Sequence, residues 1–164
     1  MRRQRPAGPP KSPYITRAGW QALNDEQDAL WKKRREVVRH LSAAAAEGDR
    51  SENAEYIYRK KQLREMDRRI RYLQKRLPHL KVVDRHPEDC EQVFFGAWIT
   101  LQDVAGQMLE YRIVGADEFD PKRNWISIDS PMARALLKRQ LDDEVGVDTP
   151  GGRLELVIVA VRYE

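Results

Sequence analysis

Apolar residues recur along the first half of the chain at intervals of three, four and seven residues. In a first run they fall at Leu23, Leu30, Val37, Leu41 and Ala44. After a short polar gap they resume at Leu63, Met66, Ile70, Leu73 and Leu77. This spacing is typical of the a and d positions of a coiled coil. It predicts two long helices, each with one apolar stripe.

Capping residues set the expected ends of these helices. Thr16 can cap a first helix that runs to about residue 47. The second helix should run from about residue 51 to residue 77, because Pro78 disfavours helical backbone in the residue before it. At 1.5 Å per residue the two helices are about 45 Å and about 40 Å long. Such similar lengths favour an antiparallel hairpin.

The turn between the helices is rich in acidic residues. Gly48 can adopt the left-handed backbone conformation that ends a helix, and Asp49 or Ser51 can cap the helix that follows. The chain is therefore expected to reverse at this point. Carboxylates would then stand at the tip of the hairpin.

After residue 78 the pattern changes to short runs of β-branched and aromatic residues. These runs, at 81–83, 93–101, 108–114, 125–128, 144–147 and 154–163, predict strands. Ser130 and Pro131 open a helix expected over residues 132–140. Antiparallel strands packed on one helix make a compact α+β domain, with Phe94, Trp98 and Trp125 expected in its core.

The chain of 164 residues thus divides into three segments. A basic, proline-rich tail at 1–13 is expected to be disordered, as a solvated terminus or as a further surface contact. A helical hairpin follows at 14–78 and an α+β domain at 79–164. No stretch has transmembrane length and no secretory signal is present, so we expect a cytoplasmic protein without membrane contact.

Charge and cysteine content limit the function classes. With 30 basic and 26 acidic residues the formal net charge is only +4, so the overall balance says little about partners. The single cysteine, Cys90, excludes an intramolecular disulfide framework and a cysteine-rich zinc site.

Basic residues gather on one face of the second predicted helix. This basic stripe steps by four, four, three and four residues through Lys60, Arg64, Arg68, Arg71 and Lys75. The spacing places all five on one face, away from the apolar stripe. The simpler interpretation is a solvated face, with Glu65 and Asp67 paired to Arg69 and Arg71 four residues on. Because two acids offset only part of the charge, contact with a polyanion is at least as well supported.

Asp49 and Glu52 are the sharpest candidates for chemistry. Their spacing at a helix start is also that of a capping box. Against this simpler interpretation, Glu47 and Glu55 add negative charge that is costly unless something positive meets it. Two carboxylates offer the hard oxygen ligands that Mg²⁺ prefers, but too few to hold it alone. A second macromolecule would have to complete the site.

The turn and the helix after it resemble the coiled-coil tip of the bacterial Gre transcript cleavage factors. The residues that carry this resemblance are GDRSENAEY at 48–56 and KKQLRE at 60–65. Three strings in the second half extend it, namely FFGAW at 94–98, RIVG at 112–115 and ISIDSPMARALL at 126–137. The resemblance covers about residues 14–163. Arg50, Ser51 and the dense basic helix are similar to the GreB branch.

The resemblance implies a fold, a partner and a role for named residues. The fold is an N-terminal antiparallel coiled coil followed by a C-terminal domain like that of FK506-binding proteins. The partner is bacterial RNA polymerase, and the C-terminal domain would dock at the rim of its secondary channel through Asp129, Ser130 and Pro131. Asp49 and Glu52 would help hold a Mg²⁺ ion shared with the polymerase and orient a water, so that the polymerase hydrolyses a backtracked transcript.

In that scheme the basic stripe would hold the 3′ segment of the nascent RNA. The chain would not be an enzyme by itself, and we expect a monomer. Two other functions stay open. One is a regulator that binds the same channel without stimulating cleavage, and the other is a nucleic-acid-binding coiled coil without a polymerase partner.

Overall fold

The computed structural model describes residues 7–48 and 53–164 and separates them into two compact units. One unit is Trp20–Leu80. The other combines the described residues up to Gly19 with Lys81–Glu164. Residues 14–19, which the sequence analysis groups with the hairpin, therefore pack with the C-terminal part of the chain.

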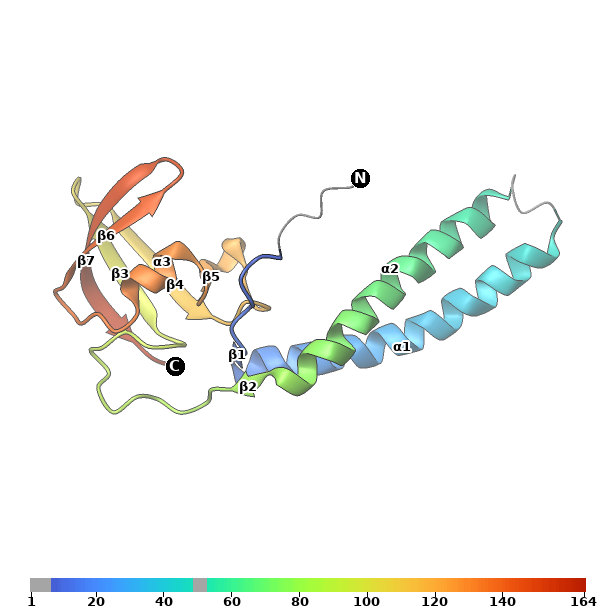
Figure 1. Cartoon of the computed structure of the whole chain (residues 1–164), viewed down its shortest axis with the longest axis horizontal. Helices are drawn as coiled ribbons and strands as arrows, with labels where there is room; N and C mark the ends of the chain where they lie inside the picture. The colour runs from blue at the N-terminus through green and yellow to red at the C-terminus, as the bar shows by residue number, and fades with distance from the viewer. Residues whose placement is uncertain (1–6, 49–52) are drawn as a thin grey trace. The chain divides into compact units, whose positions relative to one another are not determined.

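Two long helices, α1 (Arg17–Ala46) and α2 (Ala54–Arg76), form the predicted antiparallel hairpin (Figure 1). The Thr16 hydroxyl accepts a hydrogen bond from the Gly19 N–H at 3.0 Å, which confirms Thr16 as the cap of α1. The helix α2 ends where a 3₁₀ helix, η1 (Leu77–His79), begins, and η1 contains the Pro78 that predicts this end.

The hairpin is closed by the predicted apolar stripe. Its buried residues are Leu23, Val37 and Ala44 on α1 and Met66, Ile70 and Leu73 on α2. All six lie at predicted a or d positions, so the coiled-coil periodicity is confirmed.

The start of α2 differs from the prediction. Its N-cap is Asn53, and the helix begins at Ala54, about three residues later than expected. The predicted caps, Asp49 and Ser51, lie outside the described residues. Asn is as good an N-cap as Asp or Ser, so residue preference alone does not choose among three such residues at alternate positions.

The C-terminal unit is built on a five-stranded sheet in the order β5-β4-β3-β7-β6 (Figure 1). Its strands are β3 (Trp98–Asp103), β4 (Met108–Val114), β5 (Trp125–Ser127), β6 (Glu144–Thr149) and β7 (Gly152–Arg162). The neighbouring strands are antiparallel, as predicted, except that β5 runs parallel to β4. The connection between them holds the 3₁₀ helix η2 (Pro121–Arg123) and brings the chain back so that β5 begins beside Arg112 of β4.

One short helix, α3 (Pro131–Leu136), packs on the sheet. Ala133 and Leu136 join a buried cluster with strand residues Ile99, Leu101, Ile113, Val145, Val147, Leu156 and Ile158. The helix stops four residues earlier than predicted. Lys138 has a positive φ of 67°, and its N–H bonds to the Val93 carbonyl at 2.8 Å, so the chain leaves the helix to pair with residues 91–93.

A second, two-stranded sheet ties the N-terminal segment to this unit. β1 (Tyr14–Ile15) pairs in parallel with β2 (Lys81–Val82), and the Ile15 side chain is fully buried. Pro13 accepts a hydrogen bond from Lys81 at 2.8 Å. Disorder was predicted for residues 1–13, and this range is too long at its C-terminal end. Residues 11–13 make defined contacts with this unit.

The aromatic residues expected in the core lie at its margin. Phe94, Trp98 and Trp125 are half-buried, and Phe94 precedes β3 rather than lying in a strand. Trp98 and Trp125 stack with arginines on the other face of the sheet. Within the described ranges, no helix is both long and apolar enough to span a bilayer.

Candidate functional site

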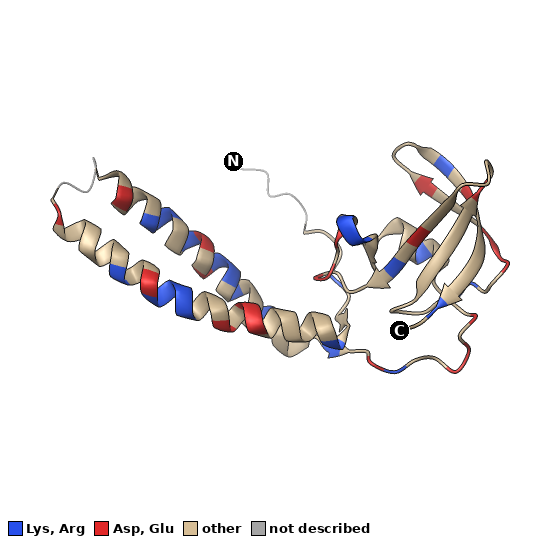
Figure 2. Ribbon diagram, turned by 180° about the vertical axis from the view of Figure 1, so that it is seen from behind, with Lys and Arg blue, Asp and Glu red and all other residues tan. Residues whose placement is uncertain are grey.

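The basic stripe lies on the solvent-facing surface of α2. All five residues, Lys60, Arg64, Arg68, Arg71 and Lys75, are exposed. In Figure 2 the blue segments of the ribbon show that basic residues recur along this helix. Within the described parts of the chain, none of the five forms a salt bridge. The stripe therefore presents positive charge without internal compensation.

Neither acid expected to neutralise the stripe does so, since Asp67 binds another arginine and Glu65 forms no salt bridge with a described residue. Asp67 binds Arg34 of α1, with 2.7 Å between Arg34 Nε and the carboxylate, and this hydrogen bond raises the pKa of Arg34. Arg69 binds Glu26 of α1 through two hydrogen bonds of 2.6 and 2.9 Å. The predicted pairing of Asp67 with Arg71 and of Glu65 with Arg69 is wrong. Instead, the pairs Arg34–Asp67 and Arg69–Glu26 link α1 to α2.

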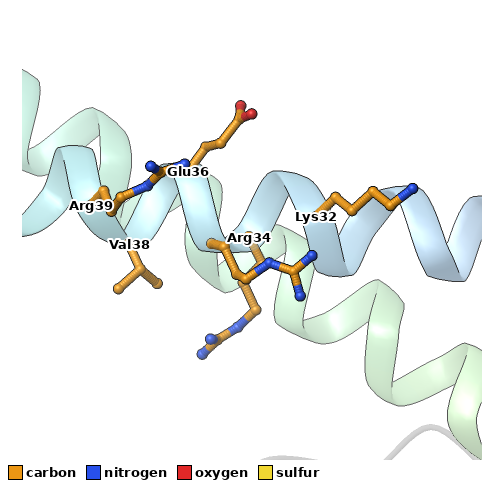
Figure 3. Close-up of a pocket in the computed structure, with 6 residues that line it drawn as sticks. Lys32, Arg34, Glu36, Val38 and Arg39 are labelled. Carbon is orange, nitrogen blue, oxygen red and sulfur yellow. The ribbon is translucent and has the colours of Figure 1, made fainter.

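A second basic surface lies on α1, and the sequence analysis did not identify it. A hollow on this helix is lined by Lys32, Arg34, Arg35, Glu36, Val38 and Arg39 (Figure 3). The signal was present in the sequence, since positions 32, 35 and 39 are spaced as one helical face. Both helices of the hairpin thus carry exposed cationic rows.

The candidate catalytic and magnesium-binding residues, Asp49 and Glu52, lie outside the described residues. The described residues next to this gap are Gly48 and Asn53. Gly48 has a positive φ of 123°, which glycine adopts without the strain of a side chain. Glu47 and Glu55 are both exposed, and Glu55 lies 3.8 Å from Arg59. Among the residues described, no group of three His, Cys, Asp or Glu side chains could hold a metal ion.

Asn53 links the two helices beside the tip. Its side-chain oxygen accepts a hydrogen bond from the Tyr56 N–H at 3.0 Å, which caps α2. Its side-chain amide donates to the Ala44 carbonyl in the last turn of α1 at 2.7 Å. One side chain therefore fixes the start of α2 against the end of α1. We did not predict this residue, because the cap was assigned to an earlier position.

In the C-terminal unit, Asp129, Ser130 and Pro131 form the start of α3. Ser130 is its N-cap and accepts from the Ala133 N–H at 3.2 Å, while Pro131 occupies the first turn and is exposed. Asp129 is engaged within the unit, since both carboxylate oxygens accept hydrogen bonds from Ser12.

Glu118 makes a second link to the same N-terminal segment. The Glu118 side chain is buried. Its carboxylate accepts hydrogen bonds from the Thr16 N–H at 3.1 Å, from the Thr16 hydroxyl and from the Gly115 N–H at 2.8 Å. Gly115 has no room for a side chain, because a Cβ atom there would lie 2.3 Å from the Tyr14 carbonyl oxygen. The N-terminal segment is therefore packed tightly beside the start of α3.

Comparison with known proteins covers both units. Residues 13–82 match the family described as transcription elongation factor, N-terminal, and residues 87–163 match transcription elongation factor, GreA/GreB, C-term. The chain belongs to the GreA/GreB family. The predicted resemblance to Gre factors is confirmed.

Close relatives of this GreA/GreB family member carry the name transcription elongation factor GreB. The protein of Haemophilus ducreyi is 58% identical over 155 residues, which are 94% of this chain and 96% of that one. The protein of Xanthomonas axonopodis pv. citri is 58% identical over 165 residues, covering 99% and 98%. Among solved structures, GreA factor homolog 1 of Thermus thermophilus aligns over 91% of this chain and 97% of its own, with 23% identity and a TM-score of 0.42.

Proposed function

We propose that this elongation factor stimulates transcript cleavage by bacterial RNA polymerase. The hairpin would enter the secondary channel and bring Asp49 and Glu52 to the polymerase active site. The observation that carries the proposal is a pair of acids, in sequence between α1 and α2, at the turn of a long hairpin in a GreA/GreB family member. The factor would act in the cytoplasm, as a monomer.

The dimensions of the hairpin support this proposal. The 23 residues of α2 give a helix about 35 Å long. A two-helix arm of this length reaches a buried site that a globular domain cannot enter. The interhelical pairs Arg34–Asp67 and Arg69–Glu26 stiffen the arm along its length.

The donor chemistry of the turn fits a magnesium ion that is shared with the partner. Asp49 and Glu52 would hold Mg²⁺ through carboxylate oxygens, and two such ligands are too few without further ones from the polymerase. A bound Mg²⁺ lowers the pKa of a coordinated water and offsets charge on the phosphodiester. This chain would supply ligands and position water, while the polymerase remains the enzyme.

The basic stripe supports a contact with the 3′ segment of the nascent RNA. Its five side chains are exposed and carry no internal counter-charge among the described residues. Contacts of this type act on phosphates and give affinity without sequence preference. The stripe would hold the extruded RNA while the tip acts on the backbone.

The C-terminal unit would dock at the rim of the channel. Asp129, Ser130 and Pro131 are the residues proposed for this contact, at the start of α3. Pro131 is exposed, whereas Asp129 is bonded to Ser12, so the N-terminal segment lies beside the proposed contact surface.

A cleavage assay on a backtracked polymerase complex tests the proposal. With labelled transcript and Mg²⁺, we expect wild type to stimulate cleavage and Asp49→Ala or Glu52→Ala to lower the rate at least about a hundredfold, since metal ligation contributes several kcal/mol. Asp28→Ala is the matched control, because Asp28 is an exposed acid of α1 without a salt bridge to any described residue. Competition binding to core polymerase is expected to be unchanged in all three variants.

Each result has a definite meaning. Full activity of either tip variant contradicts the proposed role of that acid. Tight binding by wild type without stimulated cleavage favours the alternative function, a regulator that occupies the channel and does not cleave. Binding to free RNA without association with polymerase would favour a nucleic-acid-binding coiled coil.

A further inference from the structure

A row of alternating arginines and tryptophans crosses the large sheet of the C-terminal unit. Strand pairing places Trp125 beside Arg112, Arg112 beside Trp98, and Trp98 beside Arg162. Because side chains alternate along a strand, this row lies on the face opposite the buried Ile99 and Ile113. With Arg123 before β5, these residues form the Arg–Trp row.

Each ring of the Arg–Trp row has two guanidinium groups within about 6 Å of its centre. Arg123 and Arg112 lie 5.0 and 5.1 Å from the centre of the Trp125 ring. Arg162 and Arg112 lie 4.7 and 5.9 Å from the centre of the Trp98 ring. Stacking of this kind fixes the plane of a guanidinium and leaves its N–H edge free to bind an oxyanion.

The two outer arginines have acidic partners. Arg162 contacts Glu110 at 2.8 Å and Glu164 at 3.1 Å. Arg123 lies 3.4 Å from Asp120. These carboxylates neutralise the two ends of the Arg–Trp row, and its centre remains positive.

Arg112, at that centre, has no carboxylate partner among the described residues. It is half-buried, and its side chain makes one long hydrogen bond of 3.4 Å from Nε to the Gly96 carbonyl. The adjacent Trp98 indole N–H is buried and has no acceptor within the described structure. Trp98 does not line the hollow described next, so a ligand there would meet Arg112, whose remaining N–H donors have no protein acceptor among the described residues.

A hollow of about 220 Å³ opens beside Arg112. Its lining includes Arg17, Arg85, His86, Arg112, Phe95 and Tyr163. Two acids also line it, but Asp84 is bound to Arg17 at 2.8 Å and Glu164 is bound to Arg162. The other two arginines that line the hollow, Arg85 and Arg112, form no salt bridge with the residues described.

We propose that this hollow binds a phosphate group, with Arg112 as a two-pronged donor and Arg85 as a second positive charge. A phosphate dianion matches two unpaired guanidiniums, and the planar Arg fork matches its oxygens. The Phe95 and Tyr163 rings give the hollow an aromatic wall that suits a ribose or base beside the phosphate. The phosphate comes from a free mononucleotide or from an RNA strand. The site lies in the C-terminal unit and does not depend on Asp49 or Glu52.

Nuclear magnetic resonance on the full chain tests the site directly. The Trp98 indole N–H signal is followed while inorganic phosphate, uridine monophosphate or a short single-stranded RNA is added at constant ionic strength. We expect a saturable shift of this signal. Arg112→Gln is expected to weaken binding at least about tenfold, because a charge-assisted hydrogen-bond pair is lost.

Three further variants separate a specific site from a general effect of charge. Arg112→Lys keeps the charge but not the fork, and should weaken binding several-fold. Arg85→Gln changes an exposed side chain that the fold does not need, and should weaken binding about threefold. Arg139→Gln removes the same charge from an exposed loop of the same unit and should leave binding unchanged.

The three ligands distinguish the source of the phosphate. Binding of inorganic phosphate and the mononucleotide assigns a free ligand, whereas binding of the RNA alone assigns a strand phosphate. Both results support the site if they depend on Arg112. No saturable shift with any ligand, an equal loss in Arg139→Gln, or a response only to carboxylates such as glutamate would overturn it.

Discussion

Ser12 binds both oxygens of the Asp129 carboxylate, through its backbone N–H at 2.9 Å and through its hydroxyl. Asp129 therefore holds the N-terminal segment against the start of α3, beside the surface proposed to meet the polymerase. We predict that Ser12→Ala and Asp129→Asn both weaken polymerase binding, and that Ser12→Ala has the smaller effect because it removes the hydroxyl bond and keeps the bond from the backbone N–H. Competition binding to core polymerase measures both.

The double variant shows whether Asp129 has this positioning role in addition to its proposed contact with the polymerase. If the two residues act through their shared hydrogen bonds, the losses are not additive, and the coupling amounts to about 1 kcal/mol or more. Additive losses, or an effect of Asp129→Asn alone, would show that Asp129 acts only through its proposed contact with the polymerase and not by holding the N-terminal segment. Ser42→Ala, at an exposed serine of α1, is the control for the serine change.

The Arg69–Glu26 pair joins α2 to α1 with two hydrogen bonds, yet its side chains are 42% and 37% exposed. We predict that Glu26→Ala lowers the free energy of unfolding by about 0.5–1 kcal/mol, as for a well-oriented pair near the surface. Chemical denaturation at low salt and at about 1 M salt measures this, and the effect should shrink at high salt. A loss of several kcal/mol that salt does not change would show that the pair behaves as a buried one.

The two helices of the hairpin and their buried interface could be predicted from the sequence, although the predicted start of α2 is about three residues too early. All six buried residues of its interface lie at predicted positions, because helical periodicity is a local property of the chain. The caps Thr16 and Ser130 could also be predicted from the sequence, because each accepts a hydrogen bond from a backbone N–H only three residues away. In the candidate site, the exposure of the basic stripe could be predicted from the same helical periodicity.

Contacts between distant residues could not be predicted in this way. Asp67 has an arginine four residues ahead, but it binds Arg34, 33 residues away in sequence, because the hairpin brings that side chain closer. The parallel pairing of β5 with β4 and the bond between Ser12 and Asp129 depend on how the chain folds back. The roles of Asp49 and Glu52 rest on family resemblance, not on spacing, which fits a capping box equally well.

The basic stripe gives a prediction about salt dependence. We expect Arg64→Gln, Arg68→Gln and Arg71→Gln, combined, to change stability by no more than about 0.5 kcal/mol, because all three side chains are exposed. Their loss should reduce the slope of log RNA affinity against log salt by about 0.7 for each phosphate contact removed. Cleavage and RNA crosslinking in backtracked complexes at several salt concentrations measure this slope. An unchanged slope would mean that the stripe is only solvated.

Asn53 gives the prediction closest to the tip. Asn53→Ala removes both the cap of α2 and the link to the Ala44 carbonyl, and we expect it to lower stability by about 1 kcal/mol. Because the link fixes the two helix ends that carry the acidic turn, stimulated cleavage at saturating factor should fall while polymerase binding is retained.

Asn53→Asp separates the two functions of this side chain. A carboxylate still accepts from the Tyr56 N–H and caps α2, but it has no N–H to donate to Ala44. If the link between the helices positions the tip, Asn53→Asp folds with a stable α2 and still stimulates cleavage by the polymerase less than wild type does. Wild-type cleavage rates in Asn53→Asp, together with slow cleavage in Asn53→Ala, would assign the effect to the cap alone.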